Sequence, residues 1–493
     1  GVNAGNSIVS SGNYNVVVGD EAGTAITNGD NNVAIGYAAL KTEDTGANSV
    51  AIGFNALTLQ NNDAQNYNVA VGSYAGAAVT TGTLNTLIGG LAGDSMTTGA
   101  GNTGVGYEAL SGTTTASNNT GSGFRALKAN TTGADNTAFG SNALDSNTTA
   151  SNNTAVGKSA LSVNTTGTNN VAVGYAALDA NTTGSGSVAL GRNALGAQTT
   201  GTGNVGIGNT AIGSAAVTGD YNVGIGHFAI AALTSGTNNA AVGTQALYVN
   251  TTGSSNVAMG RDALQANTTA SNNTAIGHSS LYANTTGAFN TALGRLAGAS
   301  NTTASRNTFV GQSAGTTNTT GISNVALGDN ALLSNTTASN NTAIGKDALL
   351  ANTTGSSNSS LGLNSLYGNT TGANNTAVGR SALQSNTTAA NNVAMGYGAL
   401  QLNTTGANNV AIGSLTLDAA TTATGNTAVG QGSMSTTTTG AANVAMGLSS
   451  LYSNTTGANN TALGYSSLFA NTTGDNNIAV GAYALDANTT AIN

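Results

Sequence analysis

A glycine recurs every 17 residues along almost the whole chain. It runs from Gly19 to Gly481 and marks 28 units, and only two of the 27 intervals differ, being 19 residues after Gly53 and 18 after Gly208. A unit this short cannot form a domain of its own, so each one must pack on its neighbours as one coil of a solenoid. The sequence therefore predicts one continuous repeat array over residues 1–493.

The residues around each glycine have the periodicity of a β-strand. In the unit 375–391, the residue before Gly379 is Val378, and this position is large and apolar in 27 of 28 units. Asn375, four residues before the glycine, is Asn in 26 units. Leu383, four residues after it, is Leu, Ile or Met in 23 units and Gly in five. Positions two apart share one face, which indicates strands rather than helices.

We expect each unit to contain a short strand over 375–379, a bend, a second extended piece over 381–384 and a polar turn over 386–391. Coils stacked at the sheet spacing of ~4.8 Å would form an all-β, parallel β-solenoid on the order of 130 Å long. The Val/Ile and Leu columns are expected to fill the core. The Asn column should form a hydrogen-bonded ladder, and the glycine should either need a positive φ or make room for another backbone. The residues expected to form this structural ladder are Asn32, Gly36, Asn324, Gly328, Asn375, Val378, Gly379 and Leu383.

The composition restricts the classes of function. Charged residues are 6% of the chain, the formal net charge is −8, and ten Lys and Arg residues make no basic patch for nucleic acid. Cysteine and proline are absent, and no apolar run could span a membrane. Two large apolar residues per unit give a thin core, so we expect apolar surface to be buried between chains as well. Without visible caps, the chain is expected to be a segment of a longer fibre.

Three segments carry a resemblance to a known family: Asn32-Val33-Ala34-Ile35-Gly36, Asn324-Val325-Ala326-Leu327-Gly328 and Asn375-Thr376-Ala377-Val378-Gly379. They resemble the N-x-(V/A)-(I/V)-G core of the YadA-like head repeats of trimeric autotransporter adhesins, which also have counterparts in phage tail fibres. The resemblance covers essentially the whole chain, although the unit is longer than usual and its Asn-Thr-Thr-Gly turn is unusually uniform. It implies a left-handed parallel β-roll, a homotrimer, and display on a cell or virion surface.

The position after the glycine carries most of the candidate surface groups. Aromatic residues there would pack against a neighbouring chain or, as the less favoured alternative, stack on sugar rings. Six of the ten basic residues share this position, either as solvated charges or as weak binders of acidic polysaccharide. The aromatic candidates are Tyr37, Phe54, Tyr107, Tyr175, Tyr397 and Tyr465, and the basic residues are Lys158, Arg192, Arg261, Arg295, Lys346 and Arg380.

No pattern indicates catalysis, a metal site or a cofactor. The segment 311–315 matches G-x-S-x-G but is the ordinary repeat in its glycine variant. His227 and His278 occupy the variable position after the glycine and are interpreted as surface residues. Seventeen units carry Asn-Thr-Thr, formally a glycosylation sequon, which we interpret as a turn-capping Asn with Thr hydroxyls. The paired Thr residues also suggest ice binding, but adjacent residues of a strand point to opposite faces and leave only one outward column.

The function hypothesis from sequence is a non-enzymatic extracellular fibre or adhesin, a rigid repetitive rod for surface attachment. Its expected partner is itself, through a homotrimer and lateral or end-to-end assembly, with a host-surface glycan or protein as a further partner. The alternatives are a phage tail-fibre shaft and an ice- or glycan-binding solenoid.

Overall fold

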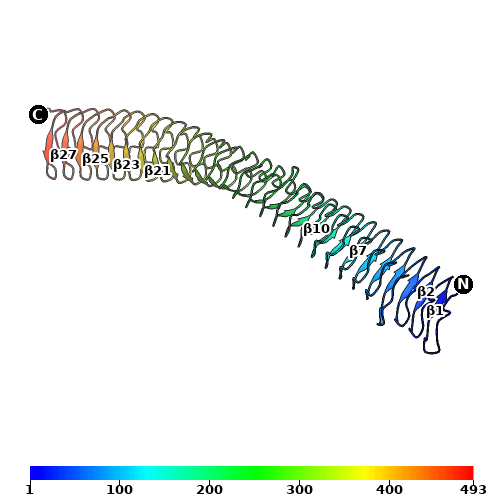
Figure 1. Cartoon of the computed structure of the whole chain (residues 1–493). Coiled ribbons are helices and arrows are strands. Elements are labelled where there is room, and N and C mark those ends of the chain that lie inside the picture. Colours follow the sequence, from blue (N-terminus) through cyan, green and yellow to red (C-terminus); the bar gives the residue numbers. More distant parts are fainter. Residues whose placement is uncertain (492–493) are drawn as a thin grey trace. The chain divides into compact units, whose positions relative to one another are not determined.

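The computed structural model describes residues 1–491, so positions 492 and 493 of the expected array lie outside it. Within that range the chain is all-β and has 28 three-residue strands, one per repeat, and no helix. Within each of the two compact units described below, each strand pairs in parallel and in register with the strand of the next coil. Thr376 of one coil, for example, pairs with Val393 of the following one. This is the parallel β-solenoid that the repeat predicts (Figure 1).

The contacts divide the chain into two compact units of the same construction. The first comprises residues 1–245 and 249–252, and the second comprises 246–248 and 253–493. The strands of the first unit are β1 (Val16–Val18), β2 (Val33–Ile35), β3 (Val50–Ile52), β4 (Val69–Val71), β5 (Thr86–Ile88), β6 (Thr103–Val105), β7 (Thr120–Ser122), β8 (Thr137–Phe139), β9 (Thr154–Val156), β10 (Val171–Val173), β11 (Val188–Leu190), β12 (Val205–Ile207), β13 (Val223–Ile225) and β14 (Ala240–Val242). Those of the second are β15 (Val257–Met259), β16 (Thr274–Ile276), β17 (Thr291–Leu293), β18 (Thr308–Val310), β19 (Val325–Leu327), β20 (Thr342–Ile344), β21 (Ser359–Leu361), β22 (Thr376–Val378), β23 (Val393–Met395), β24 (Val410–Ile412), β25 (Thr427–Val429), β26 (Val444–Met446), β27 (Thr461–Leu463) and β28 (Ile478–Val480).

Side chains along each strand alternate between the inside and the outside of the coil. In β22, Ala377 is fully buried, whereas Thr376 and Val378 are partly exposed. Asn375, two residues before Ala377, is also buried. The expectation that the Val/Ile column fills the core is therefore wrong for Val378 in a single chain. Asn375 and Val378 are three residues apart, so a strand must place them on opposite faces, and the Asn is the one that faces inward.

The second extended piece expected over 381–384 is instead a tight turn. Ser381 and Leu383 have φ angles of 57° and 50°, in the left-handed region. Their N–H groups still reach other coils, since Ser381 N donates to Leu363 O and Leu383 N donates to Ala399 O, both at 2.9 Å. The left-handed residues bend the chain sharply enough to close a coil of 17 residues while its backbone stays paired with the coils on both sides.

Burial of Leu383 offsets the cost of its backbone conformation. A left-handed φ costs an L-residue roughly 1–2 kcal/mol, whereas complete burial of a Leu side chain contributes about 1.5–3 kcal/mol. The Leu383 side chain is fully buried, so the second term prevails. The Leu column thus forms the apolar core, opposite the small Ala column of the strand.

The repeated glycine has both features that would require a glycine: a positive φ and close approach of another backbone. Gly379 has a φ of 132°, and a Cβ on it would lie 2.5 Å from Gly396 O in the next coil. Gly36 and Gly328 have nearly the same φ, 135° and 139°. Any side chain at this corner would both strain the backbone and push the stacked coils apart.

Two rows of buried Asn side chains complete the inside of the coil. The N–H of Asn375 donates to Asn358 Oδ1 in the preceding coil at 2.9 Å, and its Nδ2 donates across its own coil to Ala389 O at 2.8 Å. Asn386 lies on the other side of that carbonyl and donates to Ala389 O at 3.1 Å and to Asn369 Oδ1 at 2.7 Å. Asn32 and Asn324 make the same contacts as Asn375 in their own coils.

Large residues enter the Ala column only where glycines replace the neighbouring Leu residues. Phe309 is fully buried in β18, and the Leu positions of its own and the preceding coil are Gly315 and Gly298. A Cβ on Gly298 would lie 2.6 Å from the Phe309 ring. Leu87 in β5 stands in the same relation to Gly76 and Gly93. The volume inside the coil is therefore conserved, although the residues that supply it change.

Replacing Phe309 by Ala should destabilise the coils around β18, because two neighbouring glycines leave the cavity unfilled. Phe→Ala substitutions in cores cost about 3–5 kcal/mol. Hydrogen exchange of the amides in β17 to β19 measures this local loss of stability. Adding Gly298→Leu and Gly315→Leu to Phe309→Ala recreates the common packing and should recover most of it. Gln312→Ala, at an exposed position, is the control, and an equal effect of both single variants would refute the packing account.

Two adjacent glycines, Gly89 and Gly90, allow a test of whether the repeat needs glycine at the corner of the coil. Gly89 has a φ of 137° and its Cβ would collide with Gly106 O, whereas a Cβ on Gly90 would meet nothing nearer than the Tyr107 ring at 3.5 Å. We expect Gly89→Ala to lower the stability of β5 and β6 by roughly 1–3 kcal/mol, and Gly90→Ala to change it by less than about 0.5 kcal/mol. Thermal unfolding with local hydrogen exchange compares the two, and similar losses in both variants would contradict the assignment.

Candidate functional surfaces

The outer face of the strands carries two rows of side chains that the coil itself does not bury. One row is the first strand position, mostly Val or Thr, and the other is the third, which is large and apolar in 27 of 28 strands. In the second unit, Leu293, Leu327 and Leu361 are 45–47% exposed. In-register pairing aligns these side chains from coil to coil, so each unit presents a long apolar strip of the kind that marks an interaction surface.

The aromatic residues after the glycine are all exposed, but many of their ring faces are covered. Tyr37 stacks on Phe54 with centroids 5.3 Å apart, and Tyr74 meets the same Phe54 edge-on at 5.2 Å. Such stacks run from coil to coil and offer their edges to a ligand. Tyr175 differs, because among residues 1–491 no ring pairs with it and 53% of its surface is exposed. The remaining sequence candidates are Tyr107, which stacks on Phe124, Tyr397, which lies under Arg380, and Tyr465, which meets Tyr483 edge-on.

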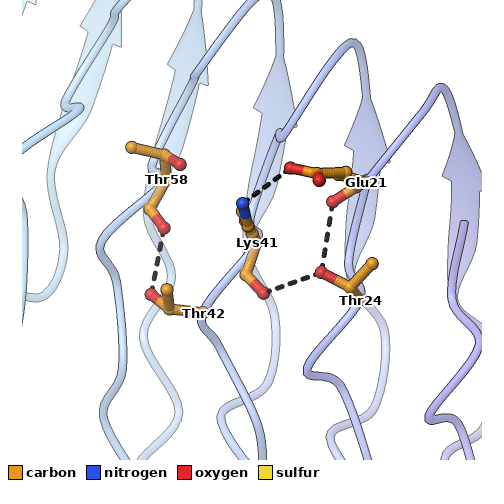
Figure 2. A network of polar contacts seen from close by, with 5 residues as sticks. All are labelled: Glu21, Thr24, Lys41, Thr42 and Thr58. Carbon is orange, nitrogen blue, oxygen red and sulfur yellow. Dashed lines mark hydrogen bonds and ion pairs between the residues drawn. The ribbon is translucent and has the colours of Figure 1, made fainter. Parts of the chain in front are cut away.

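The basic residues fall into two groups. Figure 2 shows the first kind, in which Lys41 Nζ lies 2.6 Å from Glu21 Oε2 of the preceding coil while Thr24 and Thr42 donate to backbone carbonyls nearby. Lys128 pairs with Glu108 in the same way. The second kind has no ion pair within residues 1–491. It comprises Arg306 and five of the six basic residues after the glycine: Lys158, Arg192, Arg295, Lys346 and Arg380.

The two Thr residues of each turn have different environments. Thr387 is half-buried and its hydroxyl donates to Thr404 O at 3.0 Å in the next coil, a bond that repeats along the chain. Thr388 is exposed. Only one Thr column is therefore presented to solvent, which is poorer than the flat two-column array that an ice-binding face needs.

The Asn of the Asn-Thr-Thr sequence belongs to the inside of the coil. Asn130, Asn284 and Asn471 are fully buried, and each Nδ2 is engaged in hydrogen bonds. An oligosaccharide on such a nitrogen would break the inner ladder and could not fit in the coil. The sequon positions are thus structural in the folded chain, as the capping interpretation holds.

Glu43 occupies the inner Asn position in one coil and is the most buried carboxylate. Its Oε1 accepts from Gly46 N at 2.8 Å, and its Oε2 accepts from Gln60 Nε2 at 2.8 Å and from Asn66 Nδ2 at 3.0 Å. No ion pair to Glu43 occurs within residues 1–491. Burial raises the pKa of Glu43 above its ordinary 4.5, and these hydrogen bonds oppose that rise only in part.

The segment that matches G-x-S-x-G has a packing explanation. Gly315 is the glycine that makes room for Phe309, and Gly311 is a repeat corner with a φ of 131°. In the described part of the chain, no three His, Asp or Glu side chains gather as metal ligands. No helix within residues 1–491 is long and apolar enough to cross a membrane.

Comparison with protein-family models and with curated protein sequences finds no match for this chain. The functional assignment therefore depends on the repeat, the coil and the surfaces described above.

Acidification should stabilise the coils around Glu43. The folded chain binds the carboxyl proton more tightly than the unfolded chain, so the contribution of Glu43 to stability falls as the pH rises from 4.5 through its raised pKa. Between neutral pH and 4.5, hydrogen-exchange protection factors in β2 to β4 should increase in the wild type relative to Glu43→Gln. Identical pH profiles for the two proteins would show that Glu43 does not titrate as described.

Proposed function

We propose that this chain is the shaft of an extracellular, non-enzymatic fibre in which copies of the chain associate laterally as a homotrimer. The observation that carries the proposal is the outer apolar strip on the strand face of each unit. The coil fills its interior with Ala, Leu and Asn and leaves its Val, Ile and Leu strand residues outside. A second copy of the same strip is the surface that best complements it.

The energetics of repetition favour this arrangement. Burying one Val, Leu or Ile side chain contributes about 1.5–3 kcal/mol, and the strip offers such a residue in almost every coil. The loss of translational and rotational freedom on association, about 4–15 kcal/mol, is incurred only once per partner. Contact over roughly two to ten coils therefore offsets it. The number three comes from the resemblance to YadA-like head repeats.

A shaft also fits the uniform repetition of structure along the rest of the molecule. All the coils repeat the corner glycine, most of them repeat the Asn rows and the Thr ladder, and most of the surface that remains is polar and uncharged. Such a rod would act as a spacer and a repetitive adhesive surface for a cell. A phage tail-fibre shaft shares all these features and would differ in the domains attached to it.

The native mass of strip variants tests the proposal. Leu293→Asp with Leu327→Asp puts two charges into the strip, and Thr303→Asp with Thr337→Asp puts them on exposed turn positions of the same coils. By light scattering during dilution, the wild type and the Thr variant should keep about three times the 47.5 kDa chain mass, whereas the Leu variant should dissociate at a higher concentration, because only its unchanged coils still hold it. A wild type of 47.5 kDa, or equal behaviour of the two variants, would exclude assembly through the strip.

A further inference from the structure

Lys158, Tyr175 and Arg192 form a row of unpaired groups on three consecutive coils. Each lies two residues after the end of a strand: Lys158 follows β9, Tyr175 follows β10 and Arg192 follows β11. These strands are paired in parallel and in register, with Val171 opposite Thr154 on one side and Val188 on the other. The three side chains therefore follow one another along the same corner of the first unit.

The charges of this row have no partner within the described residues 1–491. All three residues are exposed, and no ion pair involves Lys158 or Arg192 within residues 1–491. Between residues 146 and 219 the only other charged residue is Asp179. Asp179 is half-buried and forms an ion pair with neither cation. The row is thus a local positive site on a chain whose formal net charge is −8.

The geometry suits a linear ligand with regularly spaced anions. Two coils separate Lys158 from Arg192, which is about 10 Å at the sheet spacing. That is close to the length of one disaccharide in an extended polysaccharide, so equivalent anionic groups of successive disaccharides would reach both cations. Tyr175 lies between them, no ring within residues 1–491 stacks on it, and its exposed surface can pack against the sugar ring between those groups.

We propose that Lys158, Tyr175 and Arg192 bind a linear acidic polysaccharide through its sulfate or carboxylate groups. Arg offers two parallel donors to either group, and Lys offers a point charge. The site rests on the proposed function, because a polysaccharide ligand gives the exposed shaft a target on another surface. Arg295, Lys346 and Arg380 share the same corner position in the second unit, although an acidic residue lies beside Lys346 at Asp347.

Binding of oligosaccharides to the full chain tests the site. The probes are a heparin oligosaccharide, which carries sulfates, a hyaluronan oligosaccharide, which carries only carboxylates, and neutral dextran. Binding of each probe is measured by calorimetry at about 50 and 150 mM salt. Lys158→Ala with Arg192→Ala should weaken binding of the acidic probe about tenfold at low salt. Arg125→Ala with Lys128→Ala removes the same two charge types where carboxylates already neutralise them, and should change it by less than about twofold.

The outcomes separate the sources and the alternatives. Binding of heparin alone identifies sulfate as the recognised group, and equal binding of hyaluronan identifies carboxylate. Failure of both acidic probes to bind, equal binding of dextran, or equal loss in the two double variants overturns the proposal. Tyr175→Ala should weaken binding about fivefold without changing the native mass. A change in mass would make Tyr175 a contact between copies and would also overturn it.

This test can fail independently of the fibre proposal. A monomeric chain that still binds the acidic probe would refute the trimer and leave the site intact. A trimer that binds neither acidic probe would refute the site alone.

Discussion

The structure depends on pairing between consecutive coils, because no coil can satisfy its own polar groups. In the turn 381–384 the N–H groups of Ser381 and Leu383 donate to the coils before and after it, and in the strand the N–H groups do so by parallel pairing. The two Asn rows extend this pairing to side chains. Where both positions are Asn, they tie the strand of a coil to its own turn at one carbonyl, Ala389 O in the coil of Asn375. A buried amide that lost these partners would cost about 1–3 kcal/mol, so every coil fixes the register of the next.

The interior of the coil is narrow, and this narrowness determines which side chains must lie on the outer face. Asn and Leu already occupy the width of the coil, so the inward strand position admits little more than Ala. Only where the Leu positions are glycines, as at Gly298 and Gly315, does Phe309 fit. The large strand residues must face outward, where they are available for assembly. The strip on the outside is thus a consequence of the ladder on the inside.

Much of this could be predicted from the sequence. The 17-residue period, the strand at each repeat, the glycine corner and the first Asn row follow from columns of residue types. The prediction that the Val378 side chain faces inward is wrong. The alternation of side chains along a strand could have corrected it, because Asn375 lies three residues away and therefore on the opposite face. The turn over 381–384 was missed because a left-handed Leu383 contradicts ordinary preference and is tolerated only through burial. The row of Lys158, Tyr175 and Arg192 needed the register of the coils to be recognised as one site.

Buried Asn side chains hold the coils together, and hydrogen exchange of their side-chain amides tests this role most directly. With Asn selectively labelled with ¹⁵N, NMR can follow the loss of each NH₂ proton in D₂O. Asn375 and Asn386 are buried and bonded, whereas Asn391 is exposed. The account predicts that the amides of the two inner columns exchange orders of magnitude more slowly than those of the outer one. A single rapidly exchanging population would contradict it.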